Sequence, residues 1–98
     1  MYEQTPMLDT LTAKGREFLG VRYPIICGAM TWVSEPNLVA SVCNNGAFAC
    51  LAGGNAPTDI LKKQIDEVRS LTTNNFAVNL ITIAPNYKEH RWSLQYHR

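Results

Sequence analysis

Two apolar segments of the chain end abruptly in small or polar residues, and these ends offer its clearest chemistry. Residues 23–30 read Tyr-Pro-Ile-Ile-Cys-Gly-Ala-Met, and residues 76–80 read Phe-Ala-Val-Asn-Leu. Gly28 and Ala29 carry at most one side-chain carbon, so the backbone there can approach a planar ligand closely. Asn79 lies among apolar residues, where an amide left without a partner costs about 1–3 kcal/mol. Its amide therefore either bonds to neighbouring backbone or contacts a ligand, and the two segments together predict a site for a flat small molecule.

Other reactive residue types form no recognisable set. Residues 53–55 read Gly-Gly-Asn, a turn signal without the spacing of a dinucleotide or phosphate-binding loop. Cys27, Cys43 and Cys50 include no Cys-x-x-Cys pair and have no nearby histidine, so we interpret them as buried thiols in a reducing compartment. No Ser/His/Asp set, carboxylate pair or metal constellation is visible, and we assign no catalytic residue and no metal ligand.

Alternating helices and strands are predicted to position these residues. The signals are apolar spacing, helix caps and glycine exits, as at Gly20 and at the Asn-Gly pair of residues 45–46. They predict helices over residues 10–19, 35–44 and 57–71, and strands over residues 23–27, 47–51 and 76–83. Residues 1–9 are expected to be a mobile lead-in. Ser34 is the expected N-cap of the second helix, whereas Ala56 before Pro57 leaves the third helix without one.

The spacing of the strands predicts the fold class. The strands begin near residues 23, 47 and 76, spaced by about the 30 residues of a βαβ unit. Residues 47–51 are apolar without alternation, which is typical of a strand buried on both faces of a parallel sheet. Right-handed crossovers would make the three strands parallel neighbours. The sequence therefore predicts an α/β fold of order β-α-β-α-β, preceded by a short helix.

Composition excludes several classes of partner. The chain has 98 residues, 46% of them hydrophobic, which fits one small globular domain. Nine basic and eight acidic residues give a net charge of +1, so we expect neither nucleic acid nor an anionic membrane surface as partner. The apolar stretches are shorter than the ~20 residues of a membrane span, and no basic region leads into an apolar one at the N-terminus. We expect a cytoplasmic protein.

The two strand motifs resemble the start of a known enzyme family. Residues 24–30, Pro-Ile-Ile-Cys-Gly-Ala-Met, and the later Phe-Ala-Val-Asn-Leu segment are similar to those of the flavin-dependent nitronate monooxygenases, formerly called 2-nitropropane dioxygenases, and of the related flavin-dependent enoyl-ACP reductases. Those enzymes are (β/α)8, or TIM, barrels that use FMN. The resemblance implies that Gly28, Ala29, Met30 and Thr31 contact the flavin and that the amide of Asn79 hydrogen-bonds to it.

The resemblance covers about residues 10–87 and stops short of a whole barrel. We expect residues 1–86 to be the N-terminal portion of a truncated FMN-binding TIM barrel and residues 87–98 to be an anomalous or truncated tail. The tail is either the product of a changed reading frame or a polar helix start that is cut short. His90 and His97 fall in this tail and are not expected to act as bases. Because three strands alone leave open sheet edges, we expect a partly folded or self-associating chain.

The implied function is an FMN-dependent oxidation of alkyl nitronates by O2, with a nitronate or nitroalkane as the small-molecule substrate. We favour it because the segment Thr31-Trp32-Val33-Ser34 looks like the monooxygenase loop. The alternatives are a fragment of a flavin-dependent enoyl-ACP reductase and a non-catalytic truncated product. Cys27 stands where the family often has Gln and does not decide between them. We expect no activity from the 98-residue chain alone, and we expect Trp32 to cover the core.

Overall fold

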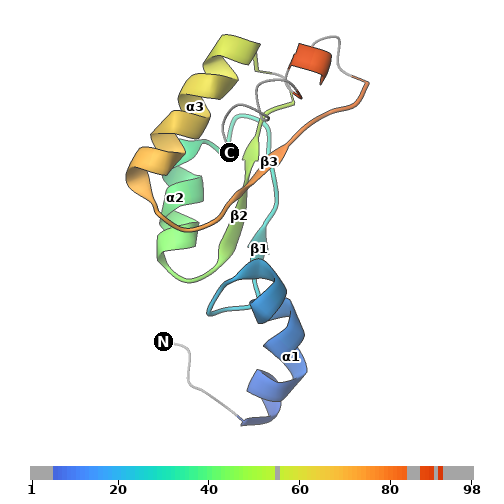
Figure 1. The fold of residues 1–98 in the computed structure, drawn as a ribbon, viewed down its shortest axis with the longest axis vertical. Helices are drawn as coiled ribbons and strands as arrows, with labels where there is room; N and C mark the ends of the chain where they lie inside the picture. Colours follow the sequence, from blue (N-terminus) through green and yellow to red (C-terminus); the bar gives the residue numbers. More distant parts are fainter. Residues whose placement is uncertain (1–5, 55, 84–86, 90, 92–98) are drawn as a thin grey trace.

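A helix precedes three strands that alternate with two further helices. The computed structural model describes residues 6–54, 56–83, 87–89 and 91. The elements, in chain order, are α1 (Pro6–Leu19), β1 (Ile26–Cys27), α2 (Pro36–Asn44), β2 (Phe48–Ala52), α3 (Thr58–Leu71) and β3 (Ala77–Asn79). This order is the one that the sequence predicts (Figure 1).

The three strands form one parallel sheet with β2 in the middle. Ile26 lies opposite Phe48 at the start of β2, and Asn79 lies opposite Ala52 at its end. The prediction of parallel neighbouring strands is therefore confirmed. The register places the candidate amide of Asn79 beside the last residue of β2.

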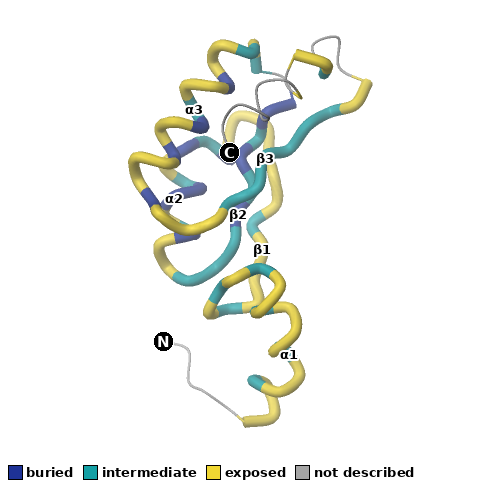
Figure 2. Tube along the Cα trace, in the orientation of Figure 1, coloured by how far each residue is buried: buried dark blue, intermediate teal, exposed yellow. Residues whose placement is uncertain are grey.

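Helices α2 and α3 pack together on one face of the sheet (Figure 1). Ala49 and Leu51 of β2 are 0% exposed and join the core that these helices complete. The other core residues are Val39, Cys43, Leu61, Ile65 and Val68. Phe48 and Cys50 alternate with the buried pair, as strand side chains must, and are only half-buried (Figure 2). The prediction that β2 is buried on both faces is thus wrong for this second face, because no described element covers it.

Helix α1 begins earlier than predicted and stands apart from the core. It starts at Pro6, whose missing N–H suits the first helical position, so residues 6–9 are helical rather than a lead-in. Residues 1–5 lie outside the described part. The exit at Gly20 has the predicted left-handed φ of 68°. None of the residues of α1 is buried (Figure 2). Phe18 is 88% exposed, so the helix presents apolar side chains without a described partner.

Strands β1 and β3 are shorter than predicted. The backbone N–H groups of Arg22 and Tyr23 donate to the carbonyl of Gly46, so these two residues bond to the turn after α2 and not to a strand. Strand β1 pairs with the first two residues of β2 and β3 with its last three. The extent of the outer strands is therefore set by the five residues of β2.

The caps of α2 and α3 differ from each other. Pro36 occupies the first turn of α2, so the N-cap is Glu35, whose carboxylate accepts from the N–H groups of Leu38 at 2.9 Å and Asn37 at 3.1 Å. The prediction that Ser34 caps this helix is wrong, because Ser34 lies one residue too early. Helix α3 begins after Pro57 without any side-chain cap, as expected.

The segment after β3 is described only in part. Residues 84–86, 90 and 92–98 lie outside the described residues, and with them His90, His97 and most of the predicted tail. Residues 87–89 are helical, and Thr58 at the start of α3 donates a hydrogen bond of 3.1 Å to the carboxylate of Glu89. Within the described ranges, no helix has the length and apolar character needed to cross a membrane.

Candidate functional site

The predicted ligand-binding residues lie where the strands end. Gly28 follows β1 directly, and Asn79 is the last residue of β3. Since the strands are parallel, their carboxyl ends point the same way, and this edge is where ligands bind in such sheets. Strand β2 lies between the two groups and ends at Ala52. The structure therefore brings the two sequence motifs to one edge, on either side of β2.

The space beside Gly28 is open. A Cβ atom built on Gly28 would meet no heavy atom within 4 Å. Its backbone is not in the left-handed region that favours glycine, so neither packing nor backbone geometry within the described structure requires glycine here. The backbone at Gly28 is therefore accessible to a ligand, as the predicted flavin contact requires.

Gly53 and Gly54, in contrast, are explained by packing. A Cβ on Gly53 would lie 2.8 Å from the backbone oxygen of Asn79 and 3.0 Å from Cδ1 of Leu61. A Cβ on Gly54 would collide with the side chain of Ile81. The loop after β2 therefore needs glycine in order to lie against β3 and α3. Asn55 lies outside the described residues.

The side chain of Asn79 is available to a ligand. It is half-buried, and its amide makes no hydrogen bond with any described residue. In register with Ala52, it lies on the sheet face that α2 and α3 leave uncovered. The amide thus offers one donor group and one acceptor at the edge where Gly28 leaves open space.

The loop from Gly28 to Ser34 is held by its own hydrogen bonds. The Ser34 hydroxyl donates to the carbonyl of Gly28 at 3.1 Å and accepts from the N–H of Met30 at 2.9 Å. The carbonyl of Met30 accepts from the N–H groups of Val33 at 3.0 Å and Ser34 at 2.8 Å. Within the described structure, the N–H and carbonyl of Ala29 have no hydrogen-bond partner. Free backbone groups are therefore found at Ala29, whereas those of Met30 are engaged.

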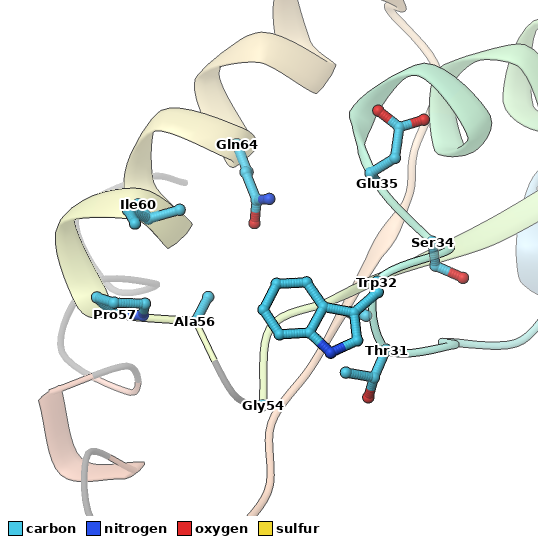
Figure 3. A pocket seen from close by; sticks show the side chains of 10 residues that line it. Thr31, Trp32, Ser34, Glu35, Gly54, Ala56, Pro57, Ile60 and Gln64 are labelled. Carbon is cyan, nitrogen blue, oxygen red and sulfur yellow. The ribbon is translucent and has the colours of Figure 1, made fainter.

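A cavity of about 190 Å³ lies beside this loop, between the starts of α2 and α3 (Figure 3). Thr31 is the only predicted flavin contact that lines it; Gly28, Ala29, Met30 and Asn79 are not among its lining residues. Four of the five predicted residues therefore lie outside the lining of this cavity.

One wall of the cavity is the ring of Trp32, toward which the side chain of Gln64 extends from α3 (Figure 3). Trp32 is 90% exposed and has a φ of 69°, so the expectation that it covers the core is wrong. The amide oxygen of Gln64 is buried and has no partner among the described residues. Of the described lining residues only Glu35 carries a charge, and this acidic group disfavours an anionic ligand in the cavity.

Two of the three cysteines are kept in the thiol form by burial. Burial raises the pKa of the Cys43 and Cys50 thiols above the ordinary value of 9.0, so both stay protonated near neutral pH. Cys43 is buried as predicted, whereas Cys27 and Cys50 are only half-buried. In the part of the chain that the structure describes, no group of three or more His, Cys, Asp or Glu residues could hold a metal ion.

Sequence reasoning missed the loop role of Ser34 and the unpartnered oxygen of Gln64. Pro36 was the available signal for Ser34: a proline in the first helical turn makes the preceding Glu35 the cap and leaves Ser34 free for other bonds. No local signal marks Gln64, because its environment is built by residues distant in the sequence.

The chain is similar to known proteins in sequence and in fold. The family profile described as nitronate monooxygenase matches residues 13–97. A probable nitronate monooxygenase of Staphylococcus aureus (strain JH9) is 42% identical over 64 residues, which are 65% of this chain and 18% of that protein. The protein of the same description from strain Newman gives the same values.

Two solved structures of FabK from Thermotoga maritima, the wild-type protein and an M276A mutant, superpose with a TM-score of 0.81 and 28% identity. They cover 86% of this chain, which spans 28% of the mutant chain and 27% of the wild-type chain. The chain spans only 18% of the length of the S. aureus relatives. The described elements are thus the β-α-β-α-β part of a (β/α)8 barrel, as the sequence predicts.

Proposed function

Because this chain belongs to the nitronate monooxygenase family, we propose that it supplies the FMN-ring contacts of a flavin-dependent oxidoreductase. The observation that carries the proposal is the pairing of open space at Gly28 with the Asn79 amide, which has no hydrogen-bond partner among the described residues, at the carboxyl edge of the sheet. A flat heteroaromatic ring needs both features, namely room beside the backbone and a polar group that fixes its orientation.

Each candidate residue has a distinct role in this proposal. Gly28 leaves room for the ring, and Ala29 offers a free N–H and a free carbonyl to the polar edge of the flavin. Met30, whose side chain is 46% exposed, offers an apolar surface rather than backbone hydrogen bonds. Asn79 bonds to the ring from the other side of β2. Thr31 continues the loop and contacts the flavin from the side that faces the cavity.

The proposed reaction is the oxidation of an alkyl nitronate or nitroalkane by O2. When bound, the flavin supplies the electron chemistry, while the protein binds the ring, orients the substrate and excludes water. In (β/α)8 barrels the phosphate-binding loops follow strands seven and eight, which this chain does not include. We therefore assign neither a phosphate site nor a catalytic base to its residues, and we expect FMN to bind this chain weakly.

Two other functions compete with this one. A flavin-dependent enoyl-ACP reductase is the second candidate, since these enzymes share the sequence motifs and the FabK structures share the fold. The third is a non-catalytic product. For either enzyme we propose a cytoplasmic location, and for the isolated chain self-association through the outer edges of β1 and β3.

A flavin titration of the purified chain tests the proposal. We expect quenching of FMN fluorescence, with binding weakened about tenfold by Gly28→Val and about fivefold by Asn79→Ala, the size of one net hydrogen bond. Gly15→Ala, in the exposed α1 where a Cβ meets nothing within 4 Å, is the matched control. No saturable binding by the wild-type chain would refute the flavin role and favour the non-catalytic product. If flavin binds, its bleaching by an alkyl nitronate rather than by a reduced nicotinamide favours the monooxygenase.

A further inference from the structure

The side chain of Ser34 is unusually enclosed for a loop hydroxyl. Ser34 is only 2% exposed, and its hydroxyl is engaged both as donor, to the carbonyl of Gly28, and as acceptor, from the N–H of Met30. These two partners lie on either side of Ala29. The hydroxyl oxygen of Ser34 therefore fixes the distance between the carbonyl of Gly28 and the N–H of Met30. These two groups flank Ala29, whose own backbone groups have no described partner.

The backbone of Ser34 connects this loop to the sheet. Its N–H donates to the carbonyl of Met30 at 2.8 Å, and its carbonyl accepts from the N–H of Ala52 at 3.1 Å. Ala52 is paired in turn with Asn79 across β2 and β3. Ser34 therefore bonds both to the loop after β1 and to Ala52, the residue of β2 that lies opposite Asn79.

Few other contacts restrain the loop. Gly28, Ala29 and Met30 are all exposed, and nothing lies within 4 Å of a Cβ built at Gly28. The hydrogen bonds that Ser34 makes are therefore the main described restraint on this segment. Without the hydroxyl, the N–H of Met30 and the carbonyl of Gly28 would lose a partner and turn toward water, and the loop would leave the conformation that presents Ala29.

We propose that Ser34 is a positioning residue that holds the loop of residues 28–30 in its ligand-binding conformation and thereby sets the affinity for the flavin ring. The statement about flavin affinity rests on the proposed function. The statement about the loop conformation rests on the hydrogen bonds of Ser34 alone. Ser34 does not touch the ligand in this scheme. It acts through the backbone of Gly28 and Met30.

Two substitutions whose new side chains have the same shape test the role of the hydroxyl. Ser34→Thr keeps the hydroxyl and adds a methyl group, whereas Ser34→Val adds the same bulk without the hydroxyl. The 98-residue chain is followed by hydrogen exchange resolved to single amides, and flavin affinity by FMN fluorescence. We expect Ser34→Val to speed exchange at the Met30 amide about tenfold or more and to weaken flavin binding about tenfold. Ser34→Thr should leave the exchange rate and the flavin affinity close to their wild-type values.

Ser41→Ala on the exposed face of α2 is the matched control, since its hydroxyl has no described partner; it should change neither quantity. Exchange at the buried Leu61 should be equal in the two Ser34 variants, which separates loop release from general loss of stability. Equal Met30 exchange in Ser34→Val and Ser34→Thr would overturn the proposal, as would faster exchange with unchanged flavin affinity. A wild-type chain that binds no flavin would refute the proposed function, while the exchange comparison would still decide the loop role.

Discussion

The substitution Gly53→Ala provides the sharpest test of how the loop after β2 is packed. The new Cβ would lie 2.8 Å from the backbone oxygen of Asn79 and 3.0 Å from Cδ1 of Leu61. Leu61 is 0% exposed and packs in the core, and the strand oxygen can move only with its strand. Overpacking of this kind costs about 1–3 kcal/mol. For a domain of this size each kcal/mol lowers Tm by about 4–8 °C.

Thermal unfolding followed by circular dichroism measures the effect, with Gly28→Ala as the matched control. Alanine fits at Gly28 without a contact within 4 Å and without backbone strain, so it should leave Tm unchanged or raise it slightly by restricting the unfolded chain. The two glycine substitutions are therefore expected to act in opposite directions. A Gly53→Ala variant that unfolds within about 1 °C of the wild type, or a Gly28→Ala variant that loses as much as Gly53→Ala, would refute the packing explanation.

Three further predictions follow from the caps, the thiols and the sheet edges. Glu35→Ala removes the N-cap of α2 and should cost about 0.5–2 kcal/mol in urea unfolding, whereas Glu67→Ala on the exposed face of α3 should cost little. Because burial raises the folded-state pKa of Cys43, its stabilising effect is complete below the ordinary pKa of 9.0 and is lost as pH rises above it. Tm should therefore fall more steeply in alkaline buffer for the wild type than for Cys43→Ala, and equal slopes would contradict this. With the outer edges of β1 and β3 open, size-exclusion chromatography should show concentration-dependent association, and a compact monomer with sharp unfolding would count against it.

The order of elements and their parallel pairing could be predicted because local sequence encodes them. Leu61, Ile65 and Val68 recur at helical spacing and are the buried residues of α3. The lengths of β1 and β3 could not be predicted in the same way. They depend on which residues of β2 each strand pairs with. This pairing is a property of the assembled sheet, and the apolar runs that begin at Tyr23 and Phe76 do not encode it.

The placement of the candidate residues at strand ends was predictable, whereas their surroundings were not. The strand ends at Gly28 and Asn79 were identified because small and polar residues interrupt apolar runs. The same reasoning treated Gly53 and Gly54 as part of a turn and could not say what packs against them. Only the fold shows that Ile81 packs against Gly54 while the space beside Gly28 is open.

The proposed function divides stability and ligand binding between the two faces of this sheet, and Gly53 lies between them. The core lies on the face toward α2 and α3, whereas Asn79 lies on the opposite, half-buried face. Asn79→Ala should therefore weaken flavin binding at nearly constant stability. Gly53→Ala should weaken both, because its Cβ would press on the backbone oxygen of Asn79 and on Leu61 at once. If Gly53→Ala lowers stability and leaves flavin affinity intact, the position of Asn79 does not control the ligand, and the flavin contact must be sought on the loop after β1 alone.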